Sequence, residues 1–142
     1  MSAGSRRHIW VTGGVEDVNS VRLHHVNVVV RPGETETVAR FYVDVLGLVP
    51  AVKPAEGTSA GGAWFDIDGA TQVHISERAD AVMHDDMHFA LVLDDFDGVL
   101  ARLAEAGAEW REQPDLFGGR RGSTRDPVGN RIELLERAGK LA

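Results

Sequence analysis

The sequence predicts an α+β fold in which two β-α-β-β-β modules form a curved mixed sheet around a central cavity. Two observations predict it. Each half of the chain begins with an apolar, strand-like stretch followed by an amphipathic helical pattern, and each half ends in residues that alternate between apolar and polar. We expect an extension at residues 1–20 and one domain at residues 21–142, with module one at about 21–78 and module two at about 86–137.

The first half provides a strand, a helix and three more strands. Residues 21–30 are rich in valine, which is typical of half-buried strands. Apolar side chains at i, i+3, i+4, i+7 and i+8 then predict a helix over 37–47, and Gly47 is a typical C-cap. Three further strands are expected at 48–52, 61–67 and 71–76.

The second half repeats this order. Residues 87–93 have the composition of a buried strand. Asp94 or Asp95 is placed to cap a helix over 96–107, whose apolar residues share one face. Three further strands are expected at 108–112, 119–126 and 131–136.

The two halves superpose with their apolar residues in phase, and the superposition pairs four polar residues. His25 falls on His88, a step of 63 residues, and His74 falls on Glu133, a step of 59. Because alternate residues of a strand share a face, all four lie opposite the apolar faces that pack under the helices. Three imidazoles and one carboxylate on a common concave surface suit a divalent metal such as Zn, Ni, Fe or Mn.

A lone histidine on a strand is more often a hydrogen-bonded structural residue than a metal ligand. We assign that role to His24, whose opposite parity directs it toward the helix or a sheet edge. His84 in a loop and His8 in the extension are expected to be solvated. A purely structural role does not explain His25, His74, His88 and Glu133, because all four occupy equivalent positions in the two halves and share the face opposite the helices.

Composition limits the class of partner. The net charge of −7 disfavours nucleic acid and anionic membranes. The chain has no cysteine, which excludes a disulfide framework and a CxxC metal or redox site. No apolar run approaches the roughly 18 residues that span a bilayer, and the first residues lack the apolar core of a secretory signal. We therefore expect a cytoplasmic protein that acts on a small molecule.

The chain resembles the vicinal oxygen chelate superfamily, which includes glyoxalase I, bleomycin-resistance proteins and extradiol dioxygenases. The residues that carry the resemblance are HHVNVVV, ARFYVDVLGL, MHFALVLDDFDGVLARLAEAGAE and RDPVGNRIELLE, spanning residues 23–136. It implies paired βαβββ modules around a divalent metal, with family ligand positions at His25, His74, His88 and Glu133. It also implies a homodimer that completes the cavity, with the metal held within one chain or between two.

The resemblance leaves the reaction open. Glyoxalase I has a glutamate at the position of His74, and methylmalonyl-CoA epimerase has a glutamine there. Extradiol dioxygenases use two histidines and one glutamate on iron, so a third histidine would crowd that site. Bleomycin-resistance proteins bind their drug without metal ligands. We expect a lyase or isomerase that acts on vicinal oxygens through a metal-stabilised enediolate, with a drug-binding protein and an iron dioxygenase as alternatives.

Roles follow for individual side chains. Glu133 is the candidate base, and His74 is the alternative. Arg120 and Arg121 could hold an anionic group, since guanidinium forks suit carboxylate and phosphate. The substrate-binding candidates are Asn27, Trp64, Gln72 and Arg121.

Overall fold

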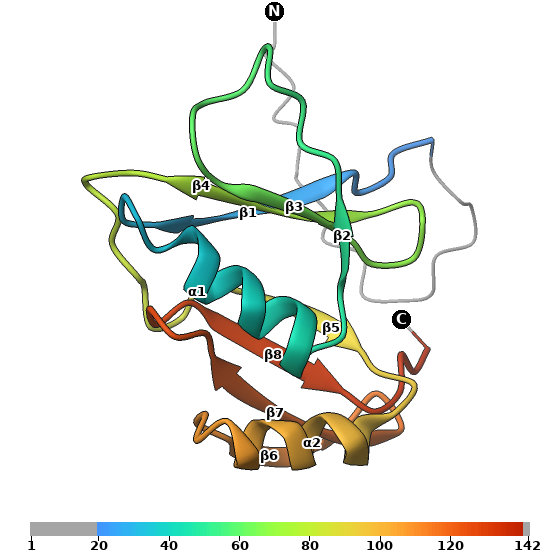
Figure 1. The fold of residues 1–142 in the computed structure, drawn as a ribbon. Helices are drawn as coiled ribbons and strands as arrows, with labels where there is room; N and C mark the ends of the chain where they lie inside the picture. Colours follow the sequence, from blue (N-terminus) through green and yellow to red (C-terminus); the bar gives the residue numbers. More distant parts are fainter. Residues whose placement is uncertain (1–19, 141–142) are drawn as a thin grey trace, which may run out of the picture.

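The computed structural model describes residues 20–140, which form two four-stranded sheets (Figure 1). Sheet A has the strand order β1-β4-β3-β2, and sheet B has the order β5-β8-β7-β6. The strands of sheet A are β1 (His25–Val30), β2 (Val49–Ala51), β3 (Ala63–Asp66) and β4 (Gln72–Glu77). The strands of sheet B are β5 (His88–Val92), β6 (Arg111–Leu116), β7 (Gly119–Arg125) and β8 (Arg131–Leu135). The predicted α+β fold class is confirmed, while residues 1–19 of the expected extension lie outside the described residues.

The two sheets repeat one hydrogen-bonding register. In each sheet the first strand pairs in parallel with the last, and the residues that begin those two strands lie opposite each other. The other strand pairs are antiparallel. His25 and His88 therefore occupy equivalent positions, and so do His74 and Glu133.

Both predicted helices are present, with one irregularity. The first helix begins at Thr35, and its last turn is π-helical: the backbone N–H of Leu46 donates to the carbonyl oxygen of Phe41, five residues earlier, at 3.1 Å. This turn ends before Gly47, whose φ is +82°. The second is capped by Asp95, whose side chain accepts a hydrogen bond from Gly98 N at 3.1 Å. The helical segments are α1 (Thr35–Arg40), η1 (Phe41–Val45) and α2 (Phe96–Glu105).

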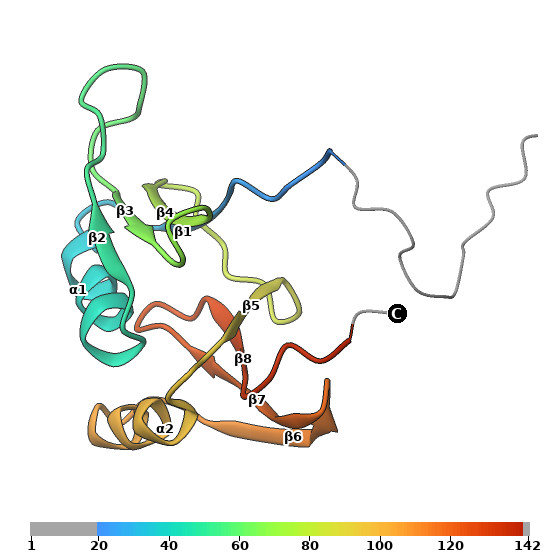
Figure 2. The same cartoon turned by 90° about the vertical axis from the view of Figure 1, so that its right-hand side faces the viewer.

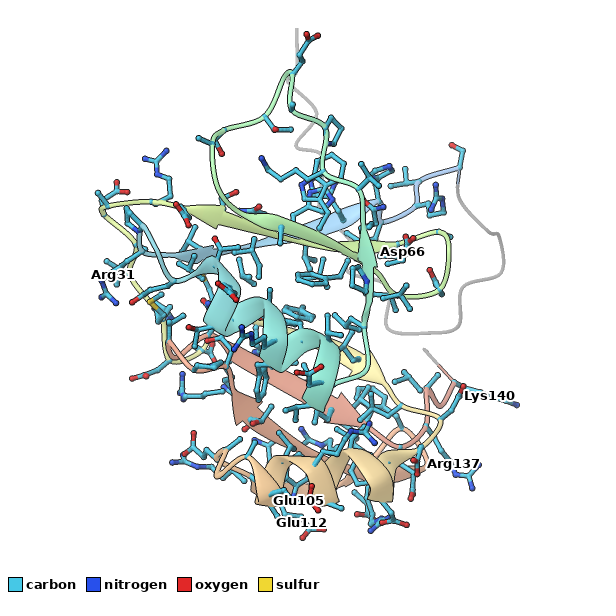
Figure 3. All side chains as sticks on the ribbon, in the orientation of Figure 1. Arg31, Asp66, Glu105, Glu112, Arg137 and Lys140 are labelled. Carbon is cyan, nitrogen blue, oxygen red and sulfur yellow. The ribbon has the colours of Figure 1, made fainter. Side chains whose placement is uncertain are left out.

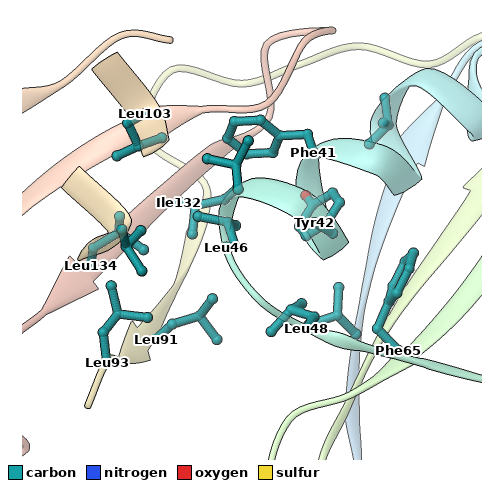
Figure 4. Close-up of a cluster of buried hydrophobic side chains, with 14 of the residues drawn as sticks. Phe41, Tyr42, Leu46, Leu48, Phe65, Leu91, Leu93, Leu103, Ile132 and Leu134 are labelled. Atoms are coloured by element: carbon teal, nitrogen blue, oxygen red, sulfur yellow. The ribbon is translucent and has the colours of Figure 1, made fainter. Parts of the chain in front are cut away.

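One hydrophobic core joins both modules. Figure 1 shows α1 between the two sheets and α2 against sheet B. Figure 4 shows the resulting cluster, in which Tyr42 and Leu46 of the first helical region approach side chains of both sheets. Leu103, Ile132 and Leu134 from module two are fully buried in the same cluster. Burying each such side chain contributes about 1.5–3 kcal/mol to folding.

Hydrogen bonds also link the modules. Tyr42 Oη donates to Asp126 Oδ2 at 3.1 Å, and both residues are buried. Asn130 Nδ2 donates to the carbonyl oxygen of Val29 at 3.0 Å, which holds the start of β8 close to the end of β1. Arg102 of α2 donates to a backbone carbonyl of η1 at 2.9 Å. These contacts fix how one module sits on the other.

The prediction for residues 108–112 was wrong in its bounds. The strand there, β6, begins at Arg111 and continues through Pro114 to Leu116. Proline cannot donate to a β-ladder, but β6 is the edge strand of sheet B, where that loss is tolerated. The register shifts between Gln113 and Leu116, as expected near a proline.

Candidate metal centre

The first pair of predicted ligands lies on the outer face of sheet A, which is the side away from α1. His25 and His74 stack with their ring centroids 4.1 Å apart. Trp64 stacks on His74 with a centroid distance of 4.0 Å and an interplanar angle of 1°. Because β4 lies between β1 and β3, the His74 ring is held between the two neighbouring rings. Phe65, the next residue along β3, points instead into the core.

His74 is kept neutral by its surroundings. Its exposed fraction is 7%, and burial lowers its pKa from 6.5 to about 4, with the His25 and His24 rings adding to the effect. A metal binds imidazole only in its deprotonated form. His74 is therefore ready to act as a ligand at pH 7.

Gln72 sets the orientation of the His74 ring. Gln72 Oε1 accepts a hydrogen bond from His74 Nε2 at 2.8 Å. Gln72 Nε2 in turn donates to Asp66 Oδ1 at 3.3 Å, and Asp66 is marked at the end of β3 in Figure 3. A histidine that donates one ring N–H to such an acceptor presents the other nitrogen as a ligand. Here that nitrogen is Nδ1.

The second pair lies on the outer face of sheet B, the side away from α2. His88 Nε2 lies 3.1 Å from Glu133 Oε2, and His88 Nδ1 donates to the carbonyl oxygen of Asp86 at 2.6 Å. Arg121 Nη1 donates to the other carboxylate oxygen, Glu133 Oε1, at 3.2 Å. The Glu133 side chain is only 12% exposed, so its orientation is closely fixed.

The donor set of this second pair fits a cation. With the Nδ1 proton of His88 directed at Asp86, Nε2 faces a carboxylate oxygen of Glu133 either with a second proton, which completes a salt bridge, or with a lone pair that can bind a metal ion. Two acceptors at this distance repel each other unless a proton or a metal ion is shared between them. Each pair thus offers two ligands of the type that Zn, Ni, Fe or Mn accepts.

The two pairs lie apart within one chain. Asn130 contacts Val29 near the end of β1, and His88 lies in register with the residue that follows Asn130. His25, however, begins β1, about 13 Å from Val29 along the strand. Within residues 20–140, no group of three or more His, Cys, Asp or Glu side chains is placed to hold a metal ion. One chain therefore presents the predicted ligands as two pairs.

Two further residues singled out in the sequence, Asn27 and Arg120, lie on different kinds of surface: Asn27 lies on the face of its sheet that is away from the helices, and Arg120 lies on the helix side. Asn27 accepts a hydrogen bond from Ser76 Oγ at 2.8 Å on the outer face of sheet A. Arg120 does not join Arg121, because adjacent strand residues point to opposite sides. It stacks on the Phe96 ring instead, with 4.9 Å between the guanidinium carbon and the ring centroid. Arg120 thus belongs to the helix side and is excluded from the site.

His24 lies beside the edge strand β1, one of the two placements expected for it. Its exposed ring meets His25 edge-on, with the two Nδ1 atoms 3.0 Å apart, and it does not pack under the helix. The chain before β1 is not yet strand here, so strand parity does not govern it. His84 is exposed in its loop, as predicted, and His8 lies outside the described residues.

Sequence reasoning missed two polar residues on the outer face of sheet B. Ser123 lies directly opposite Glu133, and Arg125 lies opposite Arg131. The signal was present, because alternation along 119–126 assigns Ser123 and Arg125 to the same face as Arg121. They were passed over because this stretch lacks the apolar residues by which a strand is recognised.

Comparisons with known proteins agree with this architecture. Residues 22–134 match the model of the Glyoxalase/Bleomycin resistance protein/Dioxygenase superfamily, and the chain belongs to this superfamily. Members of this superfamily are typically metal-dependent. A search of curated proteins returns no match.

Solved structures share the fold. A glyoxalase family protein from Bacillus anthracis has 28% identity and a TM-score of 0.75, over 85% of this chain and 99% of that one. A glyoxalase/dioxygenase from Nostoc punctiforme has 23% identity and a TM-score of 0.66, over 84% and 97%. TnmS3, an antibiotic-binding protein from Streptomyces sp. CB03234, has 21% identity and a TM-score of 0.61, over 84% and 98%. One fold thus carries differently described proteins, and the site must decide the function.

The helices of the described region are too short and too polar to cross a membrane.

Proposed function

We propose that this protein is a divalent-metal-dependent enzyme, a lyase or isomerase that acts on a small substrate with vicinal oxygens. We further propose that it is a homodimer. In this dimer His25 and His74 of one protomer would share a metal ion with His88 of the partner subunit and Glu133 of the partner subunit.

The separation of the two ligand pairs supports the dimer. A catalytic metal site in a protein commonly has three or more protein ligands. Neither sheet supplies more than two of the predicted set, and His25 begins β1 whereas His88, the first residue of β5, lies near the other end of β1. Closed two-fold assemblies are the commonest oligomers, and a two-fold axis would complete two such sites at once.

The side chains of the site have distinct roles in this proposal. The metal would supply Lewis-acid stabilisation of negative charge on a substrate oxygen. Glu133 is the candidate base that removes a proton from the carbon next to a carbonyl, since His88 and Arg121 fix its carboxylate. Neutral His74 is the alternative base. Gln72 would hold the His74 ring, and Asn27 would orient the substrate.

A second candidate function is sequestration of a natural product without catalysis. The observation that favours it is the stack of His25, His74 and Trp64, because such a stack can bind a planar aromatic ligand. This candidate predicts a substoichiometric metal content that added Zn, Ni, Fe or Mn does not raise. The enzyme proposal predicts the opposite.

Complementation between two inactive variants tests the shared site. One variant carries His25→Ala and His74→Ala, and the other carries His88→Ala and Glu133→Gln. Neither can build a complete site alone, but a mixed dimer would contain one intact set of four ligands. We expect zinc binding to return when the two are refolded together, and His84→Ala, a change at an exposed histidine, to leave zinc binding of the otherwise unmodified protein intact.

The result that contradicts the shared site is a refolded mixture that binds no more zinc than the separate variants, although the unmodified protein binds zinc. That outcome would place the ligands within one chain.

A further inference from the structure

A second polar feature shares the outer face of sheet B with the His88–Glu133 pair. It is a pocket of about 460 Å³. Figure 2 shows α2 on the other side of this sheet. The pocket is lined by strand residues of matching parity and by two acidic side chains, namely Arg111, Gln113, Ser123, Arg125, Arg131, Asp85 and Glu109. We refer to it as the arginine pocket. Three guanidinium groups and two carboxylates thus line one pocket.

Backbone contacts hold two of these arginines in place. Arg125 Nη1 donates to the carbonyl oxygen of Gly129 at 3.0 Å, and Arg131 Nη1 donates to that of Asp85 at 3.3 Å. The Arg131 side chain is only 19% exposed. A guanidinium has five N–H donors, so both arginines keep donors beyond those used for these anchors and for their acidic partners. The pocket is thus preorganised for a ligand that accepts hydrogen bonds.

Acidic side chains already contact the arginines, and two of them, Asp85 and Glu109, line the pocket, where Glu109 lies 3.3 Å from Arg111. Arg125 reaches Asp85 at 3.4 Å and Glu109 at 3.4 Å, while Arg131 reaches Asp86 at 3.5 Å. Asp85 is 99% exposed and Asp86 is 89% exposed. Long, solvent-exposed ion pairs of this kind contribute little to stability. An incoming anion can therefore displace them at small cost.

The pocket adjoins the proposed chemical centre. Ser123, which lies in the pocket, is the direct cross-strand neighbour of Glu133. Side chains in such a pair have Cβ atoms about 4.5–5.5 Å apart. A small molecule with one end in the pocket would thus have its other end beside Glu133.

We propose that the arginine pocket binds an oxyanion of the substrate, a carboxylate or a phosphate group, and that the true substrate is an anionic molecule with vicinal oxygens. The inference rests on the proposed function for the role of the bound molecule, but anion binding itself does not depend on metal. Guanidinium forks match both groups, since each offers two acceptor oxygens to parallel N–H donors.

Anion titration of the full chain tests the proposal. The arginine Nε–Hε resonances are followed by NMR while inorganic phosphate or acetate is added to EDTA-treated protein at constant ionic strength. We expect the Arg125 and Arg131 resonances to shift saturably with at least one anion, and the anion that binds more tightly assigns the group. Arg131→Gln should raise the dissociation constant at least about tenfold, because a charge-assisted contact is lost.

Two further variants separate a loss of anion binding from a loss of folding and from a general change of charge. Arg111 has a 75% exposed side chain, so Arg111→Gln should fold normally and still weaken anion binding. Arg78→Gln removes the same charge from an exposed loop arginine and should leave the dissociation constant unchanged. The proposal is overturned if sodium chloride shifts the resonances equally, if neither anion saturates, or if Arg78→Gln weakens binding as much as Arg111→Gln. Zinc binding is measured on the same samples, so a failure of the metal site is recognised separately.

Discussion

At the scale of single residues, strand parity was sufficient to find the two candidate ligand pairs, but it did not find the residues that contact them. Alternation is a local property, so it assigned His25, His74, His88 and Glu133 to the faces on which they lie. The contacts that tune them come from other strands. Gln72 on His74 and the Asp86 carbonyl on His88 depend on side-chain rotamers and loop geometry, which no local pattern contains.

Burial of neutral His74 makes stability depend on pH. Its pKa is lowered to about 4 in the folded chain, whereas an unfolded histidine titrates near 6.5. As pH falls below 6.5 the unfolded chain gains the proton first, so stability decreases down to about pH 4. In urea unfolding of EDTA-treated protein, the unmodified chain should lose about 1–2 kcal/mol more between pH 7 and pH 5 than His74→Gln. Equal losses in both proteins would contradict this account.

A buried hydroxyl offers a second prediction. Thr124 Oγ1 has no hydrogen-bond partner among the described residues, and the side chain is 1% exposed. Replacing it by the isosteric valine removes an unsatisfied polar group, so Thr124→Val should raise the free energy of unfolding by about 1 kcal/mol. Thr35→Val should do the reverse, because Thr35 Oγ1 donates to Glu77 and accepts from Gly62 N. Chemical denaturation measures both, and a destabilised Thr124→Val would refute the first.

At the scale of elements, hydrophobic periodicity predicted both helices and most strands, and it failed where the apolar signal was weak. The strand β6 contains Pro114 and several charged residues, so its composition resembles a loop. It forms because β7 provides a ladder and because an edge strand tolerates the missing N–H. The π-helical turn of η1 likewise had no local signature.

The start of β3 depends on a glycine. Gly62 has a φ of +76°, and a Cβ there would lie 2.2 Å from the carbonyl oxygen of Ile75 in β4. Gly62→Ala should therefore cost more than about 2 kcal/mol of unfolding free energy, since both backbone strain and a backbone clash are added. Gly69→Ala is the matched control, because Gly69 has a φ of +78° but open space around it. If the two variants had equal stability in thermal or urea unfolding, the close approach would not matter.

At the scale of the whole molecule, the sequence predicted the modules but not how one sits on the other. That arrangement depends on long-range contacts such as Tyr42 with Asp126, which are 84 residues apart. It decides whether the ligand pairs of one chain meet. The matching apolar patterns of the two halves contain no information on this arrangement, so the sequence left open whether one chain or two would hold the proposed metal.

Loss of the Tyr42 hydroxyl should loosen this arrangement. The carboxylate of buried Asp126 also accepts hydrogen bonds from Asn130, so Tyr42→Phe removes one of several partners. Removing a hydrogen bond to a buried charged group costs about 1.5–3 kcal/mol. We expect that decrease in the free energy of unfolding, together with weaker zinc binding if the dimer depends on module geometry. A change below about 0.5 kcal/mol, the usual size for surface substitutions, would contradict the structural role.

Native mass spectrometry of zinc-loaded protein tests the central claim most directly, because it counts chains and metal ions in one particle. We predict a dimer that contains two zinc ions and that releases them when His25 or His88 is replaced by alanine. A zinc-loaded monomer, or a dimer that takes up no metal from any of Zn, Ni, Fe or Mn, would contradict the account.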